Sequence, residues 1–236
     1  MGLRFETRRS DSPWIDTVWT CTSEEVTEMS SVATATVGLV FWSQAGRSHA
    51  AVTGPESRCG TAAVPEGAEF VGVQLAVGTT LRFVAAPALV DSGLLLPDVT
   101  ARSFALAGSR WETPAADDIE ALVSRLARAG VLARDPSIAR TLRGEPPAAT
   151  DRTIERRFRA ATGLTRGAVR QIERARTAAL LLAAGVPSAH VVHELAYYDE
   201  PHLARALRRY VGRTARQLRE GTVGVLALDL TQRTTS

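Results

Sequence analysis

The residues best suited to chemistry are arginines that recur on two short segments 49 residues apart, 150–163 and 199–212. Each segment combines an N-capping side chain, apolar residues at i, i+4 and i+7, and a closing glycine, which is the pattern of a short helix with one buried face. At 100° per residue, the opposite faces carry Arg152, Arg156 and Arg159 in the first segment and Pro201, Arg205 and Arg208 in the second. Guanidinium groups bind phosphates and the edges of guanine, so the pattern favours recognition of nucleic acid. An arginine stripe can also be an ordinary solvated face, but its repetition favours the functional interpretation.

The neighbouring elements must position these two helices. Asp135-Pro136 predicts a helix over 137–143, and residues 187–195 predict a second one, so each arginine-bearing segment becomes the second helix of a helix-turn-helix. Residues 165–184 between them predict one strong helix, about 30 Å long. This length approaches the ~34 Å pitch that separates successive major-groove segments of B-DNA. The predicted inner face of this helix consists of Ile172, Ala175, Ala179 and Leu182. Its predicted outer face carries Arg166, Arg170 and Arg174.

The first part of the chain predicts short strands separated by turns. Residues 15–21, 31–42, 48–52, 69–77 and 80–84 are rich in valine, threonine and aromatics, which indicates a small antiparallel β-sandwich or barrel. Residues 1–12 are charged, and we expect them to be frayed. Residues 117–129 predict a helix whose apolar stripe docks on a domain; the stripe is Ile119, Leu122, Val123 and Leu126.

Charge divides the chain into two unlike parts. Residues 1–116 hold 8 Arg against 12 acidic residues, whereas residues 117–220 hold 19 Arg against 12, so a net charge of −4 precedes one of +7. This asymmetry indicates a polyanionic partner for the second part. Without a signal peptide at the N-terminus or an apolar run of 18 residues, we expect a cytoplasmic protein with no membrane partner. A single histidine in residues 1–116, His49, offers no metal-ligand set, and no catalytic motif appears, so we expect neither metal, cofactor nor enzymatic activity.

Two stretches together resemble the C-terminal DNA-binding domain of the AraC/XylS family of transcription regulators. They are RTIERRFRAATGLT, residues 152–165, and YYDEPHLARALRR, residues 197–209, followed by Gly212-Arg213-Thr214. The resemblance covers residues 117–220, and the second motif is the more specific one. More loosely, the first 116 residues resemble the cupin-like sensor domains of that family.

The resemblance implies which residues face DNA. The groove-facing positions of the family fall on Arg152, Glu155 and Arg156 in the first recognition helix, about 150–162, and on Glu200, Pro201, Ala204 and Arg205 in the second, about 199–211. We expect phosphate contacts from Arg159, Arg166, Arg208 and Arg209. This chain departs from the family pattern, which usually has Gly, Gln, Phe and Pro at Ala196, Glu200, Leu207 and Ala215.

The predicted fold class is α+β with two domains. An N-terminal β-sandwich or barrel at 1–114, for sensing or dimerisation, joins through a connecting helix at 115–134 to an all-α double helix-turn-helix at 135–220, with a tail at 221–236. Residues 223–230 predict a short strand or helix. Expected partners are double-stranded DNA, a small-molecule effector, a second copy of the chain, and RNA polymerase if the protein activates transcription.

Two other classes of function remain open from the sequence. One is a DNA-repair protein that accepts an alkyl group on Cys21 or Cys59, although neither cysteine has neighbouring residues that activate a thiolate. The other is a protein-binding module whose arginine faces meet an acidic partner.

Overall fold

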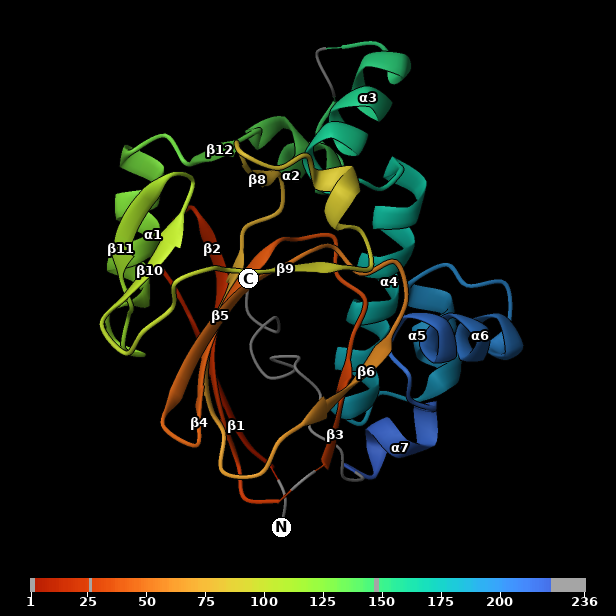
Figure 1. Ribbon diagram of the computed structural model, residues 1–236. Coiled ribbons are helices and arrows are strands. Elements are labelled where there is room, and N and C mark those ends of the chain that lie inside the picture. Colours follow the sequence, from red (N-terminus) through yellow and green to blue (C-terminus); the bar gives the residue numbers. More distant parts are fainter. Residues whose placement is uncertain (1–2, 26, 147–148, 222–236) are drawn as a thin grey trace.

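The chain folds into two parts that lie side by side (Figure 1). The computed structural model describes residues 3–25, 27–146 and 149–221. Residues 3–134 form antiparallel sheets with one covering helix and are called the sheet half; residues 135–221 are helical and are called the helical half. The predicted element at 223–230 lies outside the described residues. Among the helices described, none has both the length and the apolar composition needed to cross a membrane.

The sheet half is built on a six-stranded antiparallel sheet. Its strands in spatial order are β1 (Leu3–Arg9), β2 (Ile15–Ser23), β7 (Glu69–Leu75), β4 (Gly38–Gln44), β5 (Arg47–Thr53) and β9 (Gly93–Leu95). Three two-stranded sheets pair β3 (Thr27–Ser31) with β6 (Gly60–Val64), β8 (Thr79–Leu81) with β12 (Leu132–Arg134), and β10 (Ser103–Leu106) with β11 (Ser109–Glu112). The predicted antiparallel architecture is confirmed, but the described strands leave β1 and β9 as edges and do not close a barrel.

One apolar core joins the sheet to helix α1 (Ile119–Arg128). The predicted stripe of α1 is confirmed, since its four apolar residues are fully buried against strand residues such as Leu39, Val73 and Leu75. At the start of α1, Arg8 of β1 donates to Glu120 at 2.7 Å. This pair fastens the helix to the edge of the sheet.

The prediction that residues 1–12 are frayed is wrong, because residues 3–9 form β1. It pairs with β2 along its whole length, from Leu3↔Ser23 to Arg9↔Thr17, and Phe5 stacks on Trp19 with ring centroids 5.3 Å apart. Alternating charged side chains are typical of an edge strand, where they discourage pairing with other chains. The charged residues that suggested fraying therefore belong to the strand.

The predicted strand 31–42 is correct only in its second part, where it overlaps β4, and meets β3 only at Ser31. β3 ends at Ser31 and β4 begins at Gly38, and several residues between them pack against helices. Val32 joins a buried cluster with α4 and α6 residues, and Ala33 and Ala35 join another with Phe158. Tertiary packing overrides the local strand preference here.

The helical half contains six helices whose boundaries follow local sequence signals. They are α2 (Pro136–Leu142), α3 (Asp151–Thr162), α4 (Arg166–Ala183), α5 (Ser188–Glu194), α6 (Glu200–Tyr210) and α7 (Ala215–Arg219). The N-cap side chains that accept a backbone N–H at the start of a helix are Asp135, Thr150, Thr165, Asp199 and Thr214. These caps satisfy donors that the first helical turn leaves unpaired.

The end of α3 rests on the sheet half. Gly163 follows α3 with a φ of 69° and lies against a short 3₁₀ helix, η1 (Ala86–Leu89), and the neighbouring Val90. A Cβ on Gly163 would meet the Val90 side chain and lie 2.9 Å from the Ala86 carbonyl oxygen. Glycine is therefore needed here both for its backbone conformation and for the close approach of the two halves.

Replacing Gly163 tests this contact. Gly185 provides a matched control, because it also follows a helix with positive φ, 86°, but a Cβ there meets nothing within 4 Å. We expect Gly185→Ala to lower the free energy of unfolding by about 1 kcal/mol through backbone strain alone. Gly163→Ala should cost at least about 2 kcal/mol more because of the steric overlap. Urea unfolding measures both, and equal losses in the two variants would show that α3 does not rest on η1.

Candidate nucleic-acid interface

Helix α3 buries one face and exposes the other. Ile154 and Phe158 are buried, as predicted, and Ala161 is 7% exposed. The opposite face presents the exposed arginines Arg152, Arg156 and Arg159. The helix is thus held from beneath by apolar packing, and its guanidinium-bearing face is accessible to a partner.

Glu155, one of the residues implied to face DNA, is engaged within the protein. Its carboxylate accepts hydrogen bonds from Arg159 Nε at 3.2 Å and from the backbone N–H of Arg166, also at 3.2 Å. Arg166, expected to contact phosphate, is half-buried and donates to Asp151 at 3.2 Å. These bonds tie the first turn of α4 to α3, so both residues help to fix the angle between the two helices.

Helix α6 repeats this arrangement. Leu203 and Leu207 are buried as predicted, whereas Tyr210 is only half-buried. Asp199 caps the helix by accepting from the His202 N–H at 2.7 Å. Of the residues implied to contact DNA, one is half-buried, Ala204, and five are exposed: Glu200, Pro201, Arg205, Arg208 and Arg209.

Arg174 of α4 was predicted to point outward, but it braces the turn that precedes α6. Its guanidinium donates to the Ala196 carbonyl at 3.3 Å and lies 4.2 Å from the centroid of the buried Tyr197 ring. The pattern misleads because a long side chain at the border of the apolar stripe can reach a neighbouring element. Ala196, which this guanidinium holds, has a φ of 54°.

A second arginine brace, which the sequence pattern does not reveal, joins α2 to α3. Arg157 donates to Ser137 Oγ at 3.3 Å, and its Nε lies 4.0 Å from the Asp135 carboxylate. Both partners belong to the start of α2. At 100° per residue, Arg157 lies at the border of the apolar face of α3, next to Ala161, and not on the exposed stripe. This position is the one signal in the sequence that could have suggested a different role.

The last carbonyl groups of α6 are hydrogen-bonded to the sheet half. The Ala33 N–H donates to the Tyr210 carbonyl at 2.8 Å. The Cys59 N–H donates to the Arg209 carbonyl at 2.9 Å, and the Cys59 thiol donates to the Arg208 carbonyl at 3.3 Å. A helix leaves its final carbonyls without intrahelical partners, and here residues from another part of the chain supply them. We call these three bonds the carbonyl clamp. Periodicity and motif spacing gave no sign of it.

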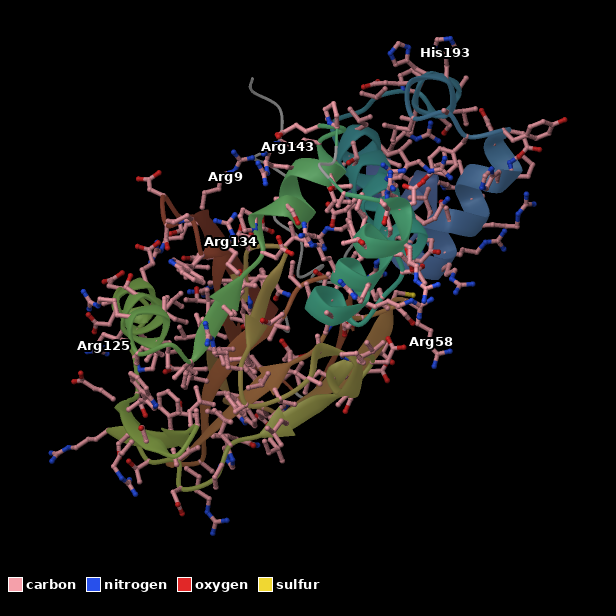
Figure 2. The ribbon with its side chains drawn as sticks, turned by 90° about the horizontal axis from the view of Figure 1, so that it is seen from above. Arg9, Arg58, Arg125, Arg134, Arg143 and His193 are labelled. Carbon is pink, nitrogen blue, oxygen red and sulfur yellow. The ribbon has the colours of Figure 1, made fainter. Side chains whose placement is uncertain are left out.

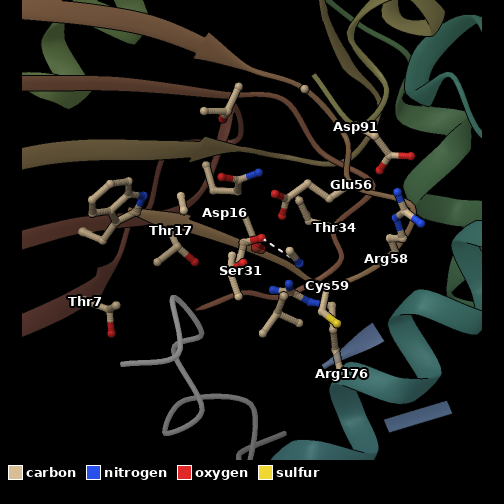
Figure 3. Close-up of a pocket in the computed structure, with 18 of the residues that line it drawn as sticks. Thr7, Asp16, Thr17, Ser31, Thr34, Glu56, Arg58, Cys59, Asp91 and Arg176 are labelled. Carbon is tan, nitrogen blue, oxygen red and sulfur yellow. Dashed lines mark hydrogen bonds between the residues drawn. The ribbon is translucent and has the colours of Figure 1, made fainter. Parts of the chain in front are cut away.

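A cavity lies directly behind the carbonyl clamp. Its volume is 470 Å³, within the range of roughly 300–1,000 Å³ typical of small-molecule sites. Residues that line it include Trp19, Glu56, Cys59 and Arg176, so β2, the 53–60 segment and α4 all contribute. We call it the interface cavity. Figure 3 shows the Glu56 side chain pointing into it and Arg176 reaching it from α4.

Glu56 lies within the 53–60 segment and is held there by its backbone. Its backbone exchanges two hydrogen bonds with Thr34, at 2.8 and 3.1 Å. Burial raises the pKa of the Glu56 carboxyl, and the Asp91 carboxylate adds to the rise, while a hydrogen bond from Ser31 and the Arg176 guanidinium oppose it. The cavity therefore disfavours the negative charge of Glu56 relative to water.

The view from above places these features at the junction of the two halves. In Figure 2, Arg58 lies at the border between the sheet half and the helical half, whereas Arg125 of α1 and His193 of α5 mark opposite ends of the molecule. Arg58 also lines the interface cavity. The cavity thus lies where the two halves meet, away from both outer ends.

Comparison with known proteins matches the helices just described to a family. Residues 148–221 match a protein-family model described as a helix-turn-helix domain. This range takes in α3 to α7, which is less than half of the chain. The match supports the resemblance to the AraC family and indicates a DNA-binding transcription regulator. Searches of curated proteins and of solved structures found no match for the chain.

The left-handed conformation of Ala196 predicts a stabilising substitution. Ala196→Gly should raise the free energy of unfolding by about 1 kcal/mol, because a side chain at positive φ is strained and Ala196 is exposed. Ala160→Gly, at an exposed position within α3, should instead lower it by about 0.5–1 kcal/mol. Chemical denaturation of both variants provides the measurement, and a loss of stability for Ala196→Gly would contradict the assigned turn.

The raised pKa of Glu56 predicts a stability difference that depends on pH. The folded state binds the Glu56 proton more tightly than the unfolded state, so this group's favourable contribution is complete below the ordinary Glu pKa of about 4.3 and is lost as pH rises through the raised value. Glu56→Gln should therefore be more stable than the wild type at pH 8, with the difference vanishing at pH 4. Unfolding curves at the two pH values test this, with Glu66→Gln at an exposed turn as the control. A gap of the same size at both pH values would contradict the prediction.

Proposed function

We propose that the protein is a transcription regulator that binds double-stranded DNA through α3 and α6, and that its sheet half modulates this binding. One observation carries the proposal: within the part of the chain that matches a helix-turn-helix domain, both helices bury apolar faces on α4 and expose arginine-bearing faces. Helices of this type place base-reading side chains in the major groove.

The length of α4 supports simultaneous binding of two groove segments. This helix is continuous over 18 residues, and so about 27 Å long. Because α3 and α6 pack at its two ends, their own widths add to this length. The two helices can then lie about one turn of B-DNA apart, ~34 Å along the duplex. In the proposed complex α3 and α6 act as two recognition helices on one side of the duplex.

The residues have different roles in this proposal. Arg156 and Arg205, both exposed in the middle of their helices, read bases, since an arginine fork matches the two acceptors on guanine. Glu200, exposed in the first turn of α6, accepts from cytosine N4. Arg159, Arg208 and Arg209 contact phosphates and position the domain.

The state of the two cysteines supports a regulator over an alkyl-accepting repair protein. Burial raises the pKa of the Cys21 thiol, and the Cys59 thiol donates a hydrogen bond to the Arg208 carbonyl oxygen. A nucleophilic thiolate needs an exposed site with positive charge nearby that lowers its pKa. We therefore favour a regulator without enzymatic activity.

Capture of genomic DNA tests the proposed function. The purified full-length protein is incubated with fragmented DNA at moderate salt, and the retained fragments are sequenced. A shared motif with two elements about one helical turn apart is expected. Failure to retard any DNA at low salt would contradict the proposal and favour a protein-binding module for the arginine faces.

Two arginine substitutions should separate base reading from phosphate contact. Arg156→Ala should relax sequence preference, because a bidentate contact to guanine is worth about 1–3 kcal/mol of discrimination. Arg208→Ala should weaken binding to all duplexes about equally and reduce the slope of log affinity against log salt by about 1. Titrations of specific and random duplex at several salt concentrations measure both effects.

Arg102→Ala, at an exposed position in the sheet half, serves as the control for charge and should leave both quantities unchanged. If Arg156→Ala and Arg208→Ala lose affinity for specific and random duplex to the same degree, the assigned division of roles is wrong.

A further inference from the structure

More carboxylates than guanidinium groups line the interface cavity. The half-buried Glu56 carboxylate lines it, together with Asp16 and Asp91. Asp91 is held in place, since its two carboxylate oxygens accept from the Ser57 N–H at 2.7 Å and from the Ser57 hydroxyl at 2.6 Å. Three carboxylates therefore line this space against two guanidinium groups.

Those two guanidinium groups do not form close ion pairs with Glu56. Arg176 donates instead to the Ala33 carbonyl at 3.3 Å, and Arg58 is exposed at the rim. Within the described part of the chain, no basic side chain lies within the 4.0 Å of an ion pair with Glu56. A cation that enters the cavity would gain this carboxylate as a partner, whereas an anion would add to the existing repulsion.

Another part of the cavity wall is aromatic. Phe5 and Trp19 both line it, and their rings stack with centroids 5.3 Å apart and planes inclined by 18°. The Trp19 indole covers Gly72 of the neighbouring strand, where no side chain would fit beneath it. The wall is therefore fixed in position and offers a flat apolar surface that also attracts cations.

From this juxtaposition we infer that the interface cavity binds a small organic cation, with an ammonium or amidinium group against Glu56 and an apolar body against Phe5 and Trp19. The inference rests on the proposed function, because it names the chemical class of the effector for a DNA-binding regulator. The volume of 470 Å³ suits a molecule of this kind.

The cavity is connected to α6 through the carbonyl clamp. Cys59 both lines the cavity and hydrogen-bonds to the end of α6, and Arg176 both lines the cavity and holds Ala33, the other residue of the clamp. A ligand that repositions Glu56 shifts the segment that leads to Cys59, three residues later. Ligand binding and the placement of α6 on DNA are therefore energetically coupled, and the coupling is reciprocal.

Three matched probes test the inference on the full-length protein. They are 2-phenylethylammonium, the neutral 2-phenylethanol and the anionic 3-phenylpropanoate, titrated at pH 7.5 by calorimetry and by intrinsic tryptophan fluorescence, to which Trp19 contributes as one of four tryptophans. We expect saturable binding of the ammonium compound and at least tenfold weaker binding of the other two. Glu56→Gln should lower the affinity for the ammonium compound at least tenfold, while Glu66→Gln at an exposed turn should leave this affinity unchanged.

Other results would overturn the inference. Equal binding of the anionic probe, wild-type affinity for the ammonium compound in Glu56→Gln, or no binding of any probe at millimolar concentration would each do so. DNA retardation on the same preparations separates this inference from the proposed function. A protein that shifts DNA but binds no ammonium compound retains its proposed function, whereas one that binds the ammonium compound but no DNA retains only the cavity assignment.

Discussion

The end of α6 imposes the main constraint on how the two halves fit together. The last carbonyls of a helix have no partners within it, and the carbonyl clamp supplies donors for three successive carbonyls of α6. These donors come from Ala33 and Cys59, which lie on two different segments of the sheet half. Neither segment can move away from α6 without breaking these hydrogen bonds. The orientation of α6 is therefore set by the sheet half as much as by the helices around it.

Local features of the helical half could be predicted from the sequence, and long-range ones could not. The caps at Thr150 and Asp199 and the buried faces of α3 and α6 follow from side chains a few residues apart, so periodicity reveals them. The carbonyl clamp joins backbone carbonyls of α6 to groups at Ala33 and Cys59, far away in the sequence, and Gly163 reaches η1 across the two halves. Backbone groups are the same at every position, so no residue pattern indicates such contacts. The sequence pattern did not predict strand β1, because an edge strand can carry as many charged residues as a loop.

The arginines of the helical half divide into two groups by what they touch. Arg157, Arg166 and Arg174 hold neighbouring elements together, whereas Arg156 and Arg205 are exposed on α3 and α6. The planar guanidinium can donate in several directions at once, so one residue type suits both tasks. Sequence position alone does not distinguish the two groups. The contacts do, and they reduce the candidate base-reading residues to a few exposed side chains.

The unbroken course of α4 has a consequence for promoter architecture. A helix of this length bends little, so the two ends that carry α3 and α6 keep a fixed distance and a fixed rotation about the axis of a bound duplex. A flexible linker would accept half-sites at many separations. In the proposed complex, α4 would allow only one separation of the half-sites, because inserting half a turn of DNA, about 5 base pairs, moves the second half-site to the far side of the duplex. If α3 and α6 bind DNA as proposed, the operators of this protein would share an invariant spacing even where their bases diverge.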